Sequence, residues 1–140
     1  WRRRLAAMPN VGALVQQARP CSAVVVRSAA SRRLEPVAGE QWLAVGDSAS
    51  RFDPLSSQGI LKALRSGIFA SYAIGDLLEQ GDDSGVKRYT RFVLDEFRSY
   101  IEVRRKYYAE EQRWPASEFW RRRHETNDDS LCLEVGSTSL

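Results

Sequence analysis

The stretch WLAVGDSASRFDPLSSQGILKAL, residues 42–64, constrains the fold more than any other part of the chain. A short apolar run at residues 41–45 stops at Gly46 and Asp47, which predicts a buried strand followed by a tight turn. From Ser57 the apolar residues recur at helical spacing. A strand that leads through a turn into a helix can bind a ligand beyond its carboxyl end. The alternative is an ordinary connection with a capping aspartate.

The residues of this connection suit a polar ligand with a flat ring. Gly46 allows a tight turn and a close ligand, Asp47 can accept hydrogen bonds from sugar-like hydroxyls, and Pro54 stiffens the loop. The first amides of the helix are unpaired and lie at its positive end, so they favour anions and electron-rich carbonyls. Gly59, in the first helical turn, leaves room for a ring over the backbone. These features indicate a nucleotide-like or flavin ligand.

The predicted helix after residue 57 carries its apolar residues near one face, together with two small residues. The members of this face are Ile60, Leu61, Leu64, Ile68, Ser71, Gly75 and Leu78. Gly67, Ser71 and Gly75 recur at four-residue spacing, and such small side chains would let a neighbour approach closely. Close packing would offset the roughly 1 kcal/mol that each glycine costs inside a helix. The alternative is that Gly67 or Gly75 ends the helix as a cap.

Two more helices are predicted after a loop at residues 81–85. Asp83 or Ser84 is expected to cap the first of them, which spans about residues 86–112. Its apolar and aromatic stripe predicts a packed core, with a ligand site as the alternative. The stripe consists of Tyr89, Val93, Phe97, Tyr100, Ile101, Arg104 and Tyr108.

The two ends of the chain are less regular. Residues 1–20 are weakly helical, with Asn10 as the expected cap of a short helix, and residues 21–27 are β-branched, which predicts a strand. Residues 28–40 are polar and contain turn residues. Ser117 is expected to cap a last short helix with the sequence EFWRRRHE.

Composition excludes several classes of function. The chain has 140 residues, enough for one modest domain. Its net charge is +3, and basic residues cluster at residues 2–4 and 121–123. These clusters are either solvated or bind phosphates. Cys21 and Cys132 lack metal-ligand spacing and are expected to be free thiols, with a disulfide as the alternative. His124 stands alone and is expected at the surface. We expect a cytoplasmic protein with no membrane or nucleic-acid partner.

The stretch GDSASRFDPLSSQGILKAL resembles the second FAD-binding motif of the flavoprotein monooxygenase superfamily. Its DPL and GI residues are most similar to the tryptophan-halogenase-like branch, and the later YYAEEQRWPASEFWRRR resembles the C-terminal helices of that branch. Within it, the chain is similar to flavoproteins that mature quinone-cofactor amine and amino-acid oxidases. The resemblance covers about residues 24–123.

This resemblance implies an α/β fold, the C-terminal portion of a Rossmann-like FAD-binding domain followed by packed helices. Residues 1–20 would end a substrate domain or form a connecting helix, and residues 21–80 would hold the FAD-binding strands, turn and helix. Residues 81–125 would form the C-terminal helices, and residues 126–140 a flexible tail.

The resemblance also implies where FAD would lie. Asp47 would bond a ribityl hydroxyl, the loop after Phe52 would run beside the isoalloxazine ring, and the amides of residues 57–59 would face the pyrimidine edge of the ring. Negative charge on the reduced flavin near that edge would be stabilised by the helix N-terminus. The candidate FAD-binding residues are Gly46, Asp47, Asp53, Pro54, Leu55, Ser57, Gln58, Gly59 and Ile60.

Two departures from the family patterns bear on the reaction. Gln58 stands where halogenases carry a Ser or Thr beside the glycine, which weakens the halogenase interpretation. Ser50 and Leu61 stand near the places where other hydroxylases of the superfamily carry a His and an Asn.

The resemblance therefore implies an FAD-dependent monooxygenase that hydroxylates an aromatic or peptidyl side chain through a flavin hydroperoxide. Its partners would be a small aromatic or peptide substrate, and reduced flavin or NAD(P)H as the electron source. The alternatives are a flavin-dependent halogenase and a non-enzymatic helical interaction module. The chain begins at Trp1 and is expected to be a fragment that lacks the GxGxxG half of the site. Alone, it is expected neither to retain FAD nor to be active.

Overall fold

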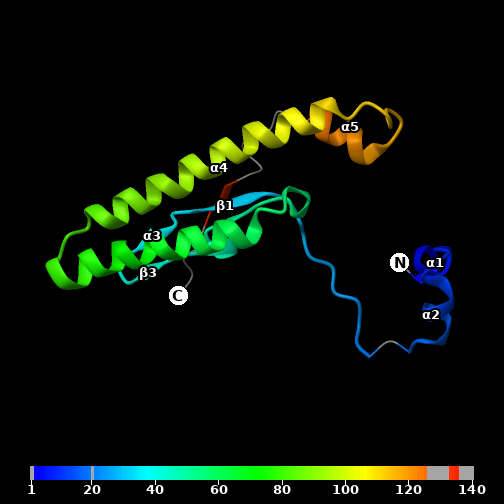
Figure 1. Ribbon diagram of the computed structural model, residues 1–140, viewed down its shortest axis with the longest axis horizontal. Helices are drawn as coiled ribbons and strands as arrows, with labels where there is room; N and C mark the ends of the chain where they lie inside the picture. Colours follow the sequence, from blue (N-terminus) through cyan, green and yellow to red (C-terminus); the bar gives the residue numbers. More distant parts are fainter. Residues whose placement is uncertain (1, 20, 126–132, 136–140) are drawn as a thin grey trace.

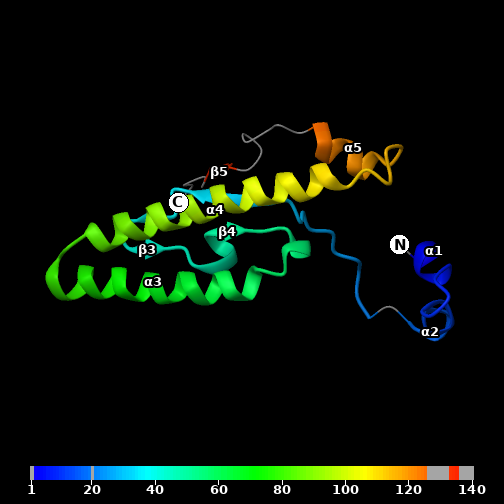
Figure 2. The same ribbon diagram turned by 45° about the horizontal axis from the view of Figure 1, so that its top comes forward.

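The computed structural model describes residues 2–19, 21–125 and 133–135. Two long helices dominate them, because α3 (Gly59–Gln80) and α4 (Ser84–Glu110) run antiparallel and side by side (Figures 1 and 2). Short strands lie against this pair of helices. The described part of the chain is therefore a mixture of helices and small sheets, in agreement with the coarse α/β class that the sequence predicts.

The turn between the two helices is held by one glycine and one carboxylate. α3 ends at Gly81, whose φ of +68° lies in the left-handed region that glycine adopts without strain. α4 begins at Ser84, whose amide donates to Oδ1 of Asp82 at 2.9 Å. Asp83 occupies the N-cap position but makes no side-chain cap bond. Asp83 is thus the N-cap residue, as the sequence predicts, but the side chain that accepts an amide at this end of α4 is that of Asp82.

α4 buries the aromatic stripe that the sequence predicts. Its buried side chains include Tyr89, Val93, Phe97, Tyr100, Ile101 and Tyr108. α3 turns small residues, Ala70 and Ala73, toward the same core. At Gly85 an added Cβ would lie 2.9 Å from the Cα of Ala73, so the two backbones approach each other closely there. The core interpretation of the stripe is confirmed.

The apolar face predicted for α3 is not the face that α3 buries. The buried residues of this helix are Lys62, Ser66, Ala70 and Ala73. Ile60 and Leu78, by contrast, are 80% and 78% exposed. The reason is steric, because α4 brings large rings to the interface and the small residues of α3 fit against them. The hydrophobic periodicity was present, but side-chain size decided which face is buried.

The two internal glycines of α3 do neither of the things predicted for them. The helix continues through Gly67 and Gly75, so neither ends it as a cap. A Cβ added at either position would meet no atom within 4 Å, so no described residue packs closely against them.

β1 (Arg32–Glu35) is the central strand of the larger sheet. It pairs antiparallel with β4 (Ser50–Arg51) and parallel with β5 (Leu133–Val135). β2 (Ala38–Gly39) and β3 (Trp42–Leu43) form a separate antiparallel pair. The predicted turn that follows β3 lies against α3.

Several strands differ from the prediction. Residues 21–27, the predicted strand, are exposed and form no strand, whereas β1 and β2 lie in the polar residues 28–40. β-propensity takes effect only where a pairing partner is available, and β1 has two partners while residues 21–27 have none among the described residues. The strand predicted at residues 41–45 forms over two residues in β3, but it is not buried as predicted, because Trp42 is 50% exposed.

The ends of the chain also correct the prediction. α1 (Arg2–Ala6) and α2 (Gly12–Gln17) lie apart from the helix pair in both views (Figures 1 and 2). Val11, and not Asn10, is the N-cap of α2. α5 (Glu118–Glu125) forms as predicted and follows α4 at its far end.

The last residues contain β5, where only a tail was expected, while residues 126–132 and 136–140 of that predicted tail lie outside the described residues. Cys21 is exposed and free, and Cys132 also lies outside them. Among the described helices, none is both long and apolar enough to cross a membrane.

Candidate functional site

The Gly-Asp turn begins with a glycine that the fold requires. The short 3₁₀ helix η1 (Gly46–Ser48) starts after the two residues that follow β3, and Gly46 has a φ of +62°. The amide of Gly46 donates to Oγ of Ser66 at 3.0 Å, and a Cβ at Gly46 would lie 3.4 Å from that of Ala63. Another residue here would be strained by its backbone angle, although α3 leaves room for a Cβ atom.

Asp47 projects outward from this turn and is held from within by a lysine. Nζ of Lys62, in α3, donates to Oδ1 of Asp47 at 2.8 Å and also to the carbonyl of Ser50. The same ammonium lies 4.8 Å from the ring centroid of Phe52. The side chain of Lys62 is 2% exposed and that of Asp47 is 71% exposed. In the described part of the chain Oδ2 of Asp47 has no hydrogen-bond partner, so this oxygen is available to a ligand hydroxyl.

Sequence reasoning missed the two side chains that support the turn. Lys62 and Ser66 lie one helical turn apart on the buried face of α3. Polar side chains in a helix are typical of a solvated face, so their types alone do not indicate burial. A useful signal would have been that alanines continue this polar pair along the same face, at Ala70 and Ala73.

The loop after Phe52 is organised by its own aspartate. Asp53 is the N-cap of η2 (Pro54–Ser56), and its Oδ1 accepts the amide of Leu55 at 3.0 Å. Ser57 has a left-handed φ of +54°, and its amide donates to the carbonyl of Pro54 at 3.2 Å. The Ser57 amide is thus engaged within the loop rather than directed outward.

Two tyrosines of α4 clamp this loop. The hydroxyl of Tyr100 accepts the amide of Asp53 at 2.6 Å and shares a hydrogen bond with Oγ of Ser31 at 2.6 Å. The hydroxyl of Tyr108 donates to Oδ2 of Asp53. The ring of Phe52 stacks on that of Tyr100, with the centroids 3.9 Å apart. Burial raises the pKa of Tyr100 above its usual value, although the Ser31 hydrogen bond opposes the shift.

The start of α3 is open. Gln58 is the N-cap of the helix without a side-chain cap bond, and its amide makes only a long contact, 3.4 Å, with Oγ of Ser56. A Cβ at Gly59 would meet no atom of the described residues within 4 Å, and Ile60 is exposed. This end of the helix therefore has space for a flat group, as the sequence predicts.

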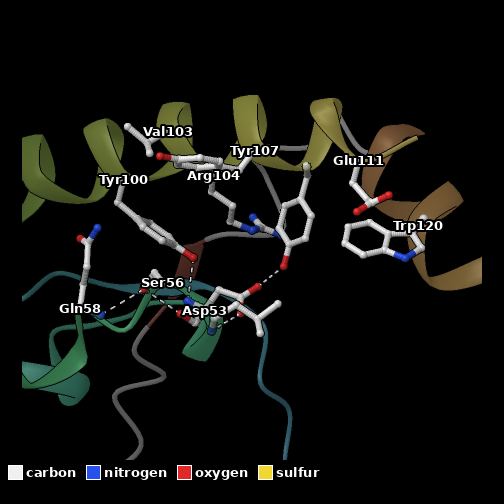
Figure 3. A pocket seen from close by; sticks show the side chains of 11 residues that line it. Asp53, Ser56, Gln58, Tyr100, Val103, Arg104, Tyr107, Glu111 and Trp120 are labelled. Atoms are coloured by element: carbon white, nitrogen blue, oxygen red, sulfur yellow. Dashed lines mark hydrogen bonds between the residues drawn. The ribbon is translucent and has the colours of Figure 1, made fainter. Parts of the chain in front are cut away.

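A pocket of about 470 Å³ lies between the loop, α4 and α5 (Figure 3). Its residues are Asp53, Leu55, Ser56, Gln58, Tyr100, Val103, Arg104, Tyr107, Tyr108, Glu111 and Trp120. Figure 3 shows Tyr100 and Arg104 pointing from α4 toward Asp53 and Ser56. Three of the predicted site residues, Asp53, Leu55 and Gln58, line this aromatic pocket. The other predicted residues do not line it, namely Gly46, Asp47, Pro54, Ser57, Gly59 and Ile60.

The charged groups of the pocket differ in how they are partnered. The guanidinium of Arg104 lies 5.2 Å from the ring centroid of Tyr108, and its buried Nε has no hydrogen-bond partner among the described residues. Glu111 accepts side-chain and backbone hydrogen bonds from Arg113, which lower its pKa to about 2. The pocket therefore combines aromatic rings with one guanidinium that could receive a polar ligand group. His124 is exposed, and its Nε2 lies 2.8 Å from the carbonyl of Tyr108.

The donor set fits the cofactor that the resemblance implies. Asp47 offers one carboxylate oxygen to a polyhydroxyl chain, while the residues at Gln58 and Gly59 leave a helix start uncovered. Among the described residues, no group of three His, Cys, Asp or Glu side chains could hold a metal ion.

The chain is similar in sequence to two known proteins, one named as an FAD-dependent oxidoreductase and one named as a brominase, which is a halogenase. The FAD-dependent oxidoreductase LodB of Marinomonas mediterranea is 35% identical over 85 residues, which are 61% of this chain and 22% of LodB. The 1H-pyrrole-2-carbonyl-(peptidyl-carrier protein) brominase of Pseudoalteromonas luteoviolacea is 38% identical over 52 residues, 37% of this chain and 13% of the brominase.

These matches confirm the predicted relationship of the chain to FAD-dependent oxidoreductases and halogenase-like proteins. The chain spans about a fifth of the length of LodB and less of the brominase. No protein-family model matches the chain. No solved structure matches it either.

Proposed function

We propose that this chain forms part of the FAD site of an oxidoreductase, within a Rossmann-like FAD-binding domain. The observation that carries the proposal is the Gly-Asp turn, in which Lys62 holds one oxygen of Asp47 and leaves the other exposed. The similarity to LodB, a protein named for FAD, supports the same cofactor. FAD would supply the redox chemistry, and this chain would bind and orient it.

Each part of the candidate site has a distinct role in this proposal. Asp47 would accept a hydrogen bond from a ribityl hydroxyl, and Gly46 would allow the backbone to lie close enough for that contact. The uncovered helix start at Gln58 and Gly59 would offer its positive end to the flavin ring and stabilise negative charge there. Asp53 acts through the loop, because both of its carboxylate oxygens already accept hydrogen bonds.

The substrate we propose is an aromatic or peptidyl side chain. The reaction is its monooxygenation, in which one atom of O2 enters the product and the other leaves as water, with two electrons from reduced flavin or NAD(P)H. The aromatic pocket between the loop and α4 supports a flat substrate, and the guanidinium of Arg104 could pair with a polar group on it. This pocket lies beside the loop Asp53 to Gln58, so the same loop would separate cofactor from substrate.

Halogenation is the second candidate, and the similarity to a brominase favours it. That relative is named for a substrate held on a peptidyl-carrier protein, so a carrier-bound aromatic ring would be the matching substrate here. Product formation that depends on bromide or chloride would support this candidate, and oxygenated product without halide would exclude it.

The experiment that tests the flavin site is the substitution Asp47→Ala in the full-length protein. We expect FAD affinity to fall at least about tenfold, because a charged hydrogen bond to the cofactor is lost. Flavin absorbance after purification and titration of the apoprotein with FAD measure the effect. Asp83→Ala is the matched control, since Asp83 is also an exposed aspartate bonded to a lysine, Lys87, at 2.8 Å. Unchanged flavin content in Asp47→Ala would remove the assigned role of Asp47.

A further inference from the structure

Lys62 is an unusual residue for the interior of a small fold. Its side chain is 2% exposed, and lysines are almost never buried to this extent unless they are paired. The ammonium donates to Oδ1 of Asp47 and to the carbonyl of Ser50, and it lies 4.8 Å from the ring centroid of Phe52. The surrounding fold therefore fixes the position of this cation.

The ion pair that Lys62 forms is asymmetric. The cation is buried, but the carboxylate of Asp47 is 71% exposed, so the pair directs its anion toward solvent. The pair between Lys87 and Asp83 has the same length, 2.8 Å, but its two side chains are 73% and 61% exposed. Buried ion pairs contribute little to stability on average, because desolvation opposes the attraction. A contribution to stability alone is thus a weak reason for placing a lysine here.

The second contact of Lys62 joins the turn to the rest of the site. The carbonyl of Ser50 belongs to β4, which leads into Phe52 and the loop that begins at Asp53. Ser66, one helical turn further along α3, accepts the amide of Gly46. The buried face of α3 therefore holds both the backbone and the carboxylate of the turn in one orientation.

We propose that Lys62 is a positioning residue for the cofactor, which fixes Asp47 so that Oδ2 points toward the cofactor hydroxyls. Fixing the carboxylate before binding lowers the entropy lost when the cofactor binds. This inference rests on the proposed function, because it assumes that Asp47 contacts FAD. It adds a residue on α3 that makes no direct contact with the ligand in that proposal.

The test is a double-mutant cycle in the full-length protein, with FAD affinity of the apoprotein as the readout. Lys62→Met keeps the length of the side chain and removes its charge, and we expect it to weaken FAD binding about tenfold. In the Asp47→Ala background the same substitution should change FAD affinity less than about twofold, because the coupled partner is gone. Lys62→Arg retains a cation and should restore most of the affinity.

Two controls separate positioning from a general effect on the fold. Lys87→Met removes the matched exposed pair and should leave FAD affinity unchanged. Thermal unfolding of each apoprotein reports any loss of stability independently of the cofactor. If Lys62→Met does not yield folded protein, Lys62→Gln takes its place in the cycle, since its amide can still donate to the Ser50 carbonyl, and the same loss of affinity is expected.

Three outcomes have different meanings. If the unmodified protein does not bind FAD, the proposed function is wrong and the inference falls with it. If the unmodified protein binds FAD and the Lys62 variants bind it equally well, Lys62 has no positioning role. An equal loss of affinity in the presence and absence of Asp47 would also overturn the inference, because Lys62 would then act through the fold and not through Asp47.

Discussion

The turn at Gly46 and Asp47 and the loop after Asp53 are two halves of the candidate site, and different helices hold them. α3 holds the turn through Lys62 and Ser66, which lie 15 and 20 residues further along the chain. α4 holds the loop through two tyrosine hydroxyls, 47 and 55 residues away in sequence. The turn is thus built by nearby residues, whereas the loop depends on the packing of a distant helix.

The two aspartates show what this difference means for function. Both carboxylate oxygens of Asp53 accept hydrogen bonds that hold the loop, one from the Leu55 amide and one from the Tyr108 hydroxyl. Asp47 gives one oxygen to Lys62, and in the described residues its other oxygen has no partner. Of these two predicted residues, Asp47 has the geometry of a ligand contact and Asp53 has that of a structural cap.

The strongest test of the contrast is Tyr100→Ala, which removes the main anchor of the loop. Tyr100 is 6% exposed, stacks on Phe52 and bonds both Ser31 and the Asp53 amide. We expect the free energy of unfolding to fall by about 3 to 5 kcal/mol, as for other buried aromatic residues cut to alanine. Urea unfolding measures this loss.

Tyr107→Ala is the control for this substitution, because Tyr107 lies on the same helix and is 70% exposed. Its cost should stay within about 0.5 kcal/mol, as for most surface substitutions. Equal costs for the two variants would mean that α4 does not anchor the loop in the way described.

The corresponding test on the turn is Ser66→Ala, with a smaller expected effect. Ser66 is buried, and its loss leaves the amide of Gly46 without a hydrogen-bond partner. We expect a cost of about 1 to 3 kcal/mol, the usual range for an unsatisfied buried donor. Faster hydrogen exchange at the Gly46 amide, together with urea unfolding, measures the effect.

Ser71→Ala on the exposed side of α3 is the matched control. It should change the free energy of unfolding by no more than about 0.5 kcal/mol. If Ser66→Ala left the Gly46 amide as protected as before, the support of the turn by α3 would be refuted.

The sequence predicts the local features of the site well, because they follow from backbone chemistry. Gly46, the start of α3 and the stripe of α4 all lie where residue type and periodicity place them. The orientation of α3 could not be predicted in this way. α3 has one face with apolar side chains and another with small side chains, and either could pack against α4. The large rings of α4 fit only against the face with small side chains.

The burial of Lys62 and Ser66, which support the turn, could not be predicted from the sequence either, and the reason is physical. A lysine in a helix is normally solvated, and its burial at Lys62 depends on three partners that meet only in the folded chain. The strand β1 is similar, since its four residues, three of them charged, become a strand through pairing with β4 and β5. Contacts distant in sequence decide both cases.

The smallest expected effect on stability concerns Glu111. Its partner Arg113 is exposed, in contrast to Lys62, the buried partner of Asp47. Hydrogen bonds from Arg113 lower the pKa of Glu111 from 4.5 to about 2 in the folded chain. A lowered pKa means that the carboxylate stabilises the fold above pH 4.5, and that this stabilisation is lost as the pH falls toward 2. Glu111→Gln should therefore lower the Tm slightly at neutral pH and leave it unchanged near pH 2.

Thermal unfolding of both proteins between pH 2 and pH 7 measures this difference, with Glu110→Gln as the control. Glu110 is the exposed neighbouring carboxylate, and in the described part of the chain the structure gives it no ion pair. The gap in Tm should close with acid for Glu111→Gln alone. A difference in Tm that persists at low pH would show that Glu111 supports the pocket by packing. Glu111 would then resemble Lys62, which contributes through both its burial and its charge.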